Sequence, residues 1–366
     1  MKIVFVIAER NYGATSLLVG QILSLKSNGL IDLYCVAGTT EKEVGLFDKL
    51  EKNDVSVVKI QGLEFNQNWL GVGRDLVFTL QRINPDIVHI QTNWQLSLFS
   101  FVKFSGGLGF KIVYTIHAFR HNSGLVKSAL AILLISGALL FFADRVIVCS
   151  TYTFNKFKIL RYKMSLLYLG VDDSFYGDIN IANIPNFGKL SVFFAGDFRK
   201  GKNQEMLIRA FSKCHGFTKG NIGILYLPGD GPLKTKCEQL ARDLGISQNV
   251  VFPGFLTKQK IIEAMKSADI AVVPTNSETF GLCIAEPFSL GKCVITRNVG
   301  VGRDIINNGV NGFIFNTEDE LLCILNQVSN NRDLLSEVCK AAYDQRDIFN
   351  WATISLKYFE IMKGVK

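Results

Sequence analysis

The sequence predicts an α/β protein of two domains, each built on a parallel sheet. Short apolar runs alternate with helical stretches along the chain, which is the pattern of a parallel sheet wrapped by helices. With 366 residues, 48% of them hydrophobic, the chain is long for a single core. A turn-rich stretch after Gly170-Val171-Asp172, through Gly177, Pro185, Asn186 and Gly188, separates two such halves and is expected to be the linker.

In the first half, apolar runs predict strands, and the stretches between them predict helices. The expected strands are Ile3–Ile7, Ile31–Val36, Val55–Ile60, Ile87–Ile90, Lys111–Ile116 and Arg145–Cys149, and the expected helices lie around Ser16–Ser27 and Asp75–Ile83. The apolar run at the N-terminus is short before charged residues and a turn follow, so we interpret it as a first strand and not as a signal peptide.

The second half repeats the alternation. The expected strands are Leu190–Ala195, Gly223–Leu227, Val250–Phe252, Ile270–Val273, Val294–Thr296 and Gly312–Phe315, and the expected helices lie near Gln204–Cys214, Lys234–Leu244 and Lys258–Ser267. These elements predict domains at 1–175 and 189–346. Ligands of such sheets bind outside the carboxyl ends of the strands, so we expect the site in the cleft between the domains.

Two glutamates, Glu278 and Glu286, stand eight positions apart around Phe280-Gly281-Leu282. The strand Ile270–Val273 precedes them, and the residues after Gly281 read as a helix, which Pro287 is expected to shorten or bend. Such a strand-loop-helix corner points backbone N–H groups outward and favours a phosphate. An isolated pair of this kind is usually two solvated charges. Here, however, hydrogen-bond donors for a phosphate lie beside carboxylate acceptors for hydroxyl groups, a combination that suits a nucleotide sugar.

At these residues the chain resembles the retaining glycosyltransferases of glycosyltransferase family 4, which have the GT-B fold and a Glu-x7-Glu motif in this setting. The resemblance covers nearly the whole length. It continues in Lys2-Ile3-Val4-Phe5-Val6 with Tyr12-Gly13-Ala14, Tyr114-Thr115-Ile116-His117, Leu169-Gly170-Val171-Asp172, Lys200-Gly201-Lys202-Asn203-Gln204, Gly229-Asp230-Gly231-Pro232, Val251-Phe252-Pro253-Gly254-Phe255 and Asn307-Asn308-Gly309-Val310-Asn311-Gly312. It implies two Rossmann-like domains facing each other across a cleft, the first binding the acceptor and the second the nucleotide sugar. It also implies a last helix, at about 347–366, that packs back on the first domain.

A basic loop, from Asp197 to Lys202, follows the strand Leu190–Ala195. Cations at the carboxyl end of a strand can neutralise a departing diphosphate; the alternative is a solvated basic turn. Members of the family usually carry an arginine directly after the glycine, where this chain has Asp197. Arg199 is the expected substitute, and Lys202 keeps the family spacing.

The resemblance also implies roles for the other residues of the corner. Glu286 would bind the ribose hydroxyls, Glu278 would contact the donor sugar, and the backbone around Phe280, Gly281 and Leu282 would bind sugar or diphosphate.

Two residues of the first domain complete the expected site. His117, directly after the strand Lys111–Ile116, would contact the donor sugar or orient the reaction, although a lone histidine is more often structural. Gly13 would let the backbone approach a phosphate or sugar, with a plain tight turn as the alternative.

We expect no metal and no other cofactor. The chain has no Asp-x-Asp in a suitable loop, no Cys-x-x-Cys and no ligand-like cluster among its four histidines, and the family works without a metal. The eight cysteines are interpreted as reduced thiols of a cytoplasmic protein. Asp172-Asp173 is expected to cap a turn.

The net charge of +8 lies wholly between Phe99 and Val171, where Asp144 is the single acid. The basic residues there are Lys103, Lys111, Arg120, Lys127, Arg145, Lys156, Lys158, Arg161 and Lys163. No recognition motif accompanies them, so we expect no nucleic acid; an anionic membrane or a diphosphate-lipid acceptor fits better. The apolar run Ser128–Ala143 is shorter than the roughly 20 residues of a spanning helix. We therefore predict a buried helix packed on the first sheet, and shallow contact of this helix with lipid stays an open alternative.

Together with these patterns, the resemblance implies a retaining, metal-independent glycosyltransferase of hexosyltransferase type, cytoplasmic and peripheral on the inner face of the plasma membrane. It would move a sugar from a nucleotide diphosphate sugar to a hydroxyl of a glycan or lipid-linked acceptor in surface polysaccharide biosynthesis, with His117 and Glu278 as catalytic residues. One alternative is a GT-B nucleotide-sugar epimerase, which needs a water-activating carboxylate that we cannot place. Another is an inactive GT-B sugar-binding subunit, against which the joint presence of Glu278, Glu286, Lys202 and His117 argues. The nucleotide base, the sugar, the linkage and the oligomeric state stay open.

Overall fold

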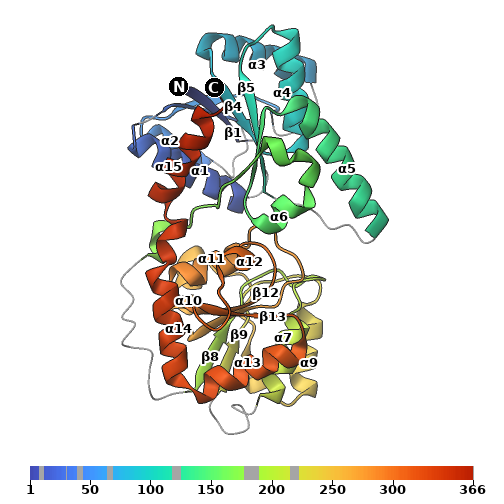
Figure 1. Ribbon diagram of the computed structural model, residues 1–366, viewed down its shortest axis with the longest axis vertical. Helices are drawn as coiled ribbons and strands as arrows, with labels where there is room; N and C mark the ends of the chain where they lie inside the picture. Colours follow the sequence, from blue (N-terminus) through green and yellow to red (C-terminus); the bar gives the residue numbers. More distant parts are fainter. Residues whose placement is uncertain are drawn as a thin grey trace. The chain divides into compact units, whose positions relative to one another are not determined.

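The computed structural model describes residues 1–7, 12–29, 31–38, 44–63, 69–117, 125–176, 189–214 and 222–365, with only the backbone of 12–16, 44, 69–70, 125–131 and 222. The chain divides into two compact units (Figure 1). Unit 1 comprises Met1–Gly170 and Asn350–Lys366, and unit 2 comprises Val171–Phe349. The linker residues expected at Gly177, Pro185, Asn186 and Gly188 lie outside the described residues.

Unit 1 contains a seven-stranded sheet with the strand order β3-β2-β1-β4-β5-β6-β7, and its strand pairs are parallel. The strands are β1 (Lys2–Ile7), β2 (Asp32–Ala37), β3 (Ser56–Lys59), β4 (Ile87–Ile90), β5 (Lys111–Ile116), β6 (Arg145–Val148) and β7 (Met164–Leu166). The order reverses between β1 and β4. In open sheets of this kind, ligands bind outside the carboxyl ends of the strands at that reversal.

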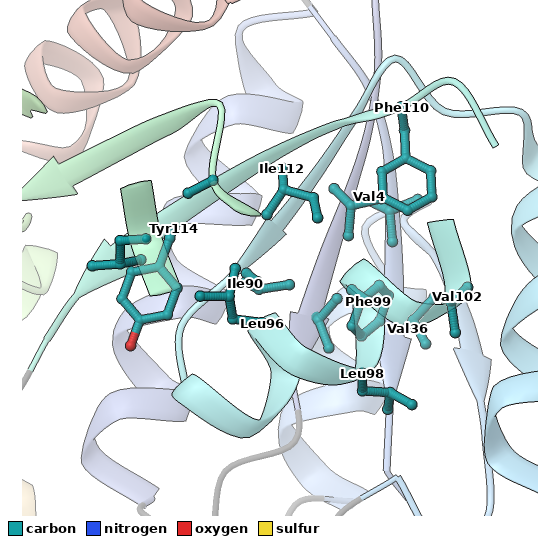
Figure 2. Packing of buried hydrophobic residues seen from close by; sticks show 14 of the residues in the cluster. Val4, Val36, Ile90, Leu96, Leu98, Phe99, Val102, Phe110, Ile112 and Tyr114 are labelled. Carbon is teal, nitrogen blue, oxygen red and sulfur yellow. The ribbon is translucent and has the colours of Figure 1, made fainter. Parts of the chain in front are cut away.

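Helices cover both faces of this sheet. They are α1 (Tyr12–Ser27), α2 (Val44–Glu51), α3 (Trp69–Ile83), α4 (Asn93–Ser105), α5 (Leu125–Phe142), α6 (Thr151–Lys156), the 3₁₀ turn η2 (Lys158–Lys163) and α15 (Trp351–Lys363). Successive side chains of a strand point to opposite faces. Val4 and Val6 therefore belong to the core under α3 and α4, part of which Figure 2 shows, whereas Ile3, Phe5 and Ile7 belong to the core under α1 and α15.

Unit 2 contains a six-stranded parallel sheet with the order β10-β9-β8-β11-β12-β13, which reverses between β8 and β11. The strands are β8 (Leu190–Phe193), β9 (Ile222–Tyr226), β10 (Val250–Val251), β11 (Ile270–Val273), β12 (Cys293–Arg297) and β13 (Gly312–Phe315). The helices are η3 (Asp173–Phe175), α7 (Gln204–Lys213), α9 (Lys234–Asp243), η5 (Ser247–Asn249), α10 (Lys258–Ser267), α11 (Leu282–Ser289), α12 (Gly302–Ile305), α13 (Glu318–Asn330), α14 (Arg332–Asp344) and η6 (Arg346–Phe349).

The last helix, α15, packs on unit 1 against α1. Its Tyr358 is fully buried, and a hydrogen bond of 2.9 Å joins the Tyr358 hydroxyl to Nδ1 of His89 on β4. Nε2 of His89 lies 2.7 Å from Oγ1 of Thr115 on β5. The Trp351 ring fits against Gly170, where a Cβ atom would lie only 2.2 Å from it. Packing and a buried polar link therefore both hold this helix to unit 1.

The predicted α/β class with two parallel sheets is confirmed, and several strands have the predicted bounds, among them Ile87–Ile90, Lys111–Ile116 and Ile270–Val273. Helix α1 begins at Tyr12, earlier than expected, which makes Gly13 its second residue. Asp172 caps a turn as predicted, because its side chain accepts a hydrogen bond from the Ser174 backbone N–H.

The apolar run Ser128–Ala143 forms most of α5, but it is a buried helix on one face only. Ser136 and Leu139 face the core, whereas Leu133, Leu134, Phe141 and Phe142 are exposed. The expectation of a buried helix on the first sheet is therefore correct for the inner face of α5 and wrong for its outer face. Within the described ranges, no helix combines the length and the apolar character that a membrane crossing requires.

Candidate functional site

In unit 2, the expected donor-site residues gather where the strand order reverses. Lys202 lies in the loop after β8, and Glu278 lies in the loop after β11, the strand paired with β8. The side chain of Asn203 joins the two loops, since its amide nitrogen lies 3.0 Å from the Pro274 carbonyl oxygen and 2.6 Å from Oδ1 of Asn276. The carboxyl ends of β8 and β11 therefore carry one connected group of loops.

The loop after β9 joins the same group through its backbone. Gly196 N–H donates to the Pro228 carbonyl at 3.1 Å, and Phe198 N–H donates to the Asp230 carbonyl at 2.9 Å. Gly229, with φ of 134°, approaches so closely that a Cβ atom would lie 2.2 Å from the Gly196 carbonyl oxygen. The Gly-Asp-Gly-Pro segment thus permits a close approach of two backbones that any larger residue would prevent.

Lys202 and Glu278 form an ion pair at the centre of this group. Lys202 Nζ donates to Oε1 of Glu278 at 2.6 Å, and the two side chains are only 15% and 16% exposed. Burial lowers the pKa of Lys202, but the neighbouring Cys283 and Glu278 outweigh it, so that this pKa is raised overall. The ammonium therefore stays charged, as a cation that binds a diphosphate must.

Helix α11 begins beside this pair. Gly281 has a φ of 95° and precedes the first turn, and no side chain caps it. Phe280 is buried with its ring edge-on to Phe349, and its carbonyl oxygen accepts from Val301 N–H. The Phe280 side chain is therefore part of the core, and the N-terminus of α11 at Gly281 and Leu282 is the part of this segment that could meet a ligand.

Glu286 lies in the next turn of α11, partly buried. Burial raises the pKa of its carboxyl to about 7, against the opposing effect of Lys258, while Asp172 adds to the rise. Lys258 and Asp172 are themselves paired at 2.5 Å. A carboxyl that is half ionised near neutral pH accepts hydrogen bonds from hydroxyls without carrying a full buried charge.

Arg199 is the most exposed of the expected donor-binding side chains. It lies 3.8 Å from Asp197, and both side chains are 62% exposed. It is also close enough to Lys202 to oppose the rise in the pKa of that lysine. The substitution of Arg199 for the arginine expected at position 197 stays a prediction.

His117 directly follows β5 in unit 1, as predicted. Its Nε2 is buried without a hydrogen-bond partner, and burial lowers the pKa of the ring to about 4. The imidazole is thus neutral at physiological pH, with one polar atom left for a ligand. Gly13 also belongs to unit 1, in the first turn of α1.

A second group of polar side chains in unit 1 escaped the sequence reasoning. Gln91 follows β4, and both side-chain atoms of its amide are buried without a partner. Gln95 Nε2 is also buried and unpartnered, while its Oε1 accepts from the backbone N–H groups of Gln91 and Thr92 at 2.8 and 3.0 Å. The signal in the sequence was Gln91 directly after the strand Ile87–Ile90, with Gln95 four positions later.

Among the described residues, no group of three or more His, Cys, Asp or Glu side chains is placed to hold a metal ion. At the N-terminus of α11, the positive charge comes from Lys202 and the helix end. The expectation that no metal takes part stays a proposal.

Solved structures with the same architecture span the whole chain. HepE of Anabaena, solved in complex with UDP, aligns over 100% of both chains with a TM-score of 0.80 and 20% identity. The lipopolysaccharide outer core galactosyltransferase WaaB aligns over 99% of this chain and 100% of its own, with a TM-score of 0.73 and 16% identity. These likenesses confirm the predicted GT-B fold.

Two family models cover most of the sequence. Residues 34–175 match Glycosyltransferase Family 4, and residues 180–345 match glycosyl transferases group 1. The chain is a glycosyltransferase of the GT-B type. A relative of full length is the O-antigen biosynthesis glycosyltransferase WclY of Escherichia coli, 24% identical over 378 residues, which cover 100% of this GT-B glycosyltransferase and 99% of WclY.

Proposed function

We propose that this GT-B glycosyltransferase transfers a hexose from a nucleotide diphosphate sugar to a hydroxyl of a glycan or lipid-linked acceptor, with retention of the anomeric configuration and without a metal ion. The observation that carries the proposal is the meeting of Lys202, Glu278 and the N-terminus of α11 at the strand reversal of unit 2. HepE, with bound UDP or UDP-glucose, supports a nucleotide donor. The names of WclY and WaaB support an acceptor in surface polysaccharide synthesis.

The diphosphate is the part of the donor that gains charge when the sugar leaves. Lys202 and the backbone N–H groups at the start of α11 are placed to stabilise that charge. In the free protein, Glu278 holds the ammonium at 2.6 Å. The donor therefore exchanges one anion for another at Lys202, and Glu278 becomes available to the sugar hydroxyls.

Glu286 is the expected acceptor for the two ribose hydroxyls. Its place on α11, one helical turn beyond Leu282, lets the nucleoside and the diphosphate be bound by the same helix. The roles of Glu278 and Glu286 thus follow the order of the donor, with sugar and diphosphate at the helix start and ribose beyond.

Unit 1 supplies polar groups suited to sugar hydroxyls. His117 Nε2, the Gln91 amide and Gln95 Nε2 are buried polar atoms without partners. Gln91 and His117 directly follow the neighbouring strands β4 and β5. Such atoms each cost about 1–3 kcal/mol if they stay unpaired. A sugar, with hydroxyls that both donate and accept, fits amides that do the same.

Calorimetric titration with UDP, and with GDP in parallel, tests the donor site. Lys202→Ala and Glu286→Ala should each weaken binding of the preferred nucleotide by about 10-fold or more, because each removes a hydrogen bond to a charged group. Lys200→Ala and Glu337→Ala are matched controls, since both residues are exposed and Lys200 lies in the same loop. Equal affinity in the site variants and controls, with the fold intact, would remove this site.

Retention and metal independence have separate tests. The anomeric proton of the product, followed by NMR from the first turnover, should keep the configuration of the donor. Transfer should also survive saturating EDTA, because Lys202 and the helix end supply the charge that a metal would otherwise provide. An inverted product, or activity lost in EDTA and restored by manganese or magnesium, contradicts that part of the proposal.

A further inference from the structure

Helix α5 presents an apolar face to solvent. Leu134 and Phe141 are seven positions apart and lie on one side of the helix, where they are 66% and 80% exposed. Leu133 and Phe142 flank them and are also exposed. A surface helix normally carries polar side chains on its outer face. The described outer face of α5 carries leucine and phenylalanine instead.

Two further elements bring apolar side chains to the end of α5. Lys103 on α4 lies 3.6 Å from Asp144, just beyond α5, so the end of α4 that carries Phe104, 93% exposed, lies beside the end of α5. Lys163 on η2 donates to the carbonyl oxygens of Leu140 and Ala143 at 2.6 and 2.7 Å. We call the resulting surface the α5 patch, and its exposed apolar members are Phe104, Leu133, Leu134, Phe141, Phe142, Ile159 and Tyr162.

The structure separates the basic residues of this region into those that bind other parts of unit 1 and those that are exposed. Lys103 and Lys111 both pair with Asp144, and Lys163 is bound to the end of α5, so these three serve the fold. Lys158 and Arg161 are exposed. Residues three apart in a 3₁₀ turn lie on one side, so Lys158 and Arg161 form a basic row beside the apolar row of Ile159 and Tyr162. The side chains of Arg120 and Lys127 lie outside the described residues.

We propose that the α5 patch docks unit 1 on an anionic lipid bilayer, with the apolar side chains in the headgroup region and Lys158 and Arg161 against the lipid phosphates. Exposed apolar patches of this kind mark sites of protein or membrane contact. Because Lys158 and Arg161 lie within the patch and the nearby Asp144 is already paired with two lysines, the charge of the patch favours an anionic surface. We place the helix along the membrane surface, because Ser136 and Leu139 on one side of it are buried in unit 1 while the apolar side chains on its other side are exposed. This docking inference does not depend on the proposed function. A lipid-linked acceptor for the docked enzyme would depend on it.

Sedimentation with vesicles tests this inference on the intact protein without substrates. Vesicles of phosphatidylglycerol and phosphatidylcholine should bind the protein, and vesicles of phosphatidylcholine alone should bind it far less. Lys158→Gln with Arg161→Gln should weaken binding roughly 30-fold, at about 5-fold for each charge. Phe104→Ser with Phe141→Ser should weaken it by at least about 10-fold. Binding of the wild type should fall as salt rises.

Matched controls lie in unit 2. Lys260→Gln with Lys266→Gln removes two exposed charges, and Phe255→Ser removes a phenylalanine that is 75% exposed; both should bind vesicles like the wild type. Equal binding to neutral and anionic vesicles, binding to neither, or equal losses in patch and control variants would overturn the inference. So would a dimer in vesicle-free solution that the Phe104 and Phe141 substitutions dissociate, because the patch would then contact a second copy. UDP titration of the same variants separates failure here from failure of the donor site.

Discussion

At the scale of single residues, Glu278 has two competing partners in the proposed reaction. In the free protein it holds Lys202, and with a donor bound it is expected to contact the sugar. Glu278→Gln should therefore change UDP affinity and the rate of sugar transfer in opposite directions. UDP should bind about 3- to 10-fold more tightly, because the diphosphate no longer competes with a carboxylate for Lys202. Transfer should fall about 10- to 100-fold through loss of a charged hydrogen bond to the sugar.

Calorimetry with UDP and a transfer assay check both effects, and Glu337→Gln, on the exposed face of α14, is the control. Weaker UDP binding in Glu278→Gln would show that the carboxylate positions Lys202 for the diphosphate and does not compete with it.

Gln91 offers a second test at this scale, since its buried side-chain amide has no partner. Gln91→Leu should raise the stability of unit 1 by up to about 1 kcal/mol, because an unpaired buried amide is removed. It should also lower transfer, since the fold does not use this amide and a substrate would. Gln95→Leu is the contrasting variant. It should destabilise, because Gln95 Oε1 accepts two backbone hydrogen bonds. Thermal melting and initial rates of sugar transfer test these expectations. A stabilised Gln91→Leu variant with full activity would exclude a role for Gln91 in substrate binding.

At the scale of elements, the attachment of α15 to unit 1 combines packing with one buried polar link. Tyr358 reaches His89, which in turn reaches Thr115 on the neighbouring strand. Tyr358→Phe keeps the ring and leaves one nitrogen of His89 buried without its partner. We expect a loss of about 1–3 kcal/mol in the free energy of unfolding.

Tyr162→Phe is the control, because the Tyr162 side chain is 67% exposed and its hydroxyl can be replaced by water. Hydrogen exchange should show increased opening of α15 in Tyr358→Phe and not in Tyr162→Phe. Equal protection in both variants would mean that packing of Trp351 and its neighbours alone holds the helix.

At the scale of the whole molecule, two buried histidines predict loss of stability in acid. Burial lowers the pKa of His117 to about 4 and, with the charge of His117, that of His89 to about 3. The unfolded chain takes up these protons near pH 6.5 and the folded chain does not. Stability is thus fully present above about pH 6.5 and falls below it, by about 1.4 kcal/mol per pH unit for each histidine.

Glu286 acts with the opposite sign. Because its folded pKa is raised to about 7, the folded chain holds a proton that the unfolded chain releases above about pH 4.5, so stability falls as pH rises between these values. Melting temperatures between pH 4.5 and 8 should therefore fall less steeply in acid for His117→Gln than for the wild type, and more steeply for Glu286→Gln. The same pH profile in all three proteins would contradict both assignments.

Much of the fold was determined by the sequence alone, because strand and helix formation depend on local pattern. The run Ile270–Val273 is β11, and Lys111–Ile116 is β5, since strands buried on both faces of a parallel sheet read as short, continuous apolar stretches rich in branched residues. The corner from Glu278 to Glu286 was predicted in the same way, from a strand, a glycine and a helical stretch. Helices α2, α4, α6, α12, α13 and α14 were not predicted, and their bounds come from the structure.

The tertiary structure decided what depends on contacts between distant residues. Lys202 and Glu278 are 76 positions apart, and only the pairing of β8 with β11 brings them together. Gln91 became a candidate only when its amide proved to be buried without a partner. Lys163 was excluded from the basic residues available to lipid only when its ammonium proved to bind the end of α5. The pKa of Glu286 likewise follows from burial and from Lys258 and Asp172. Residue types and spacing specify which groups are available, but burial and distance set their charge and partners, and these arise only when the chain has folded.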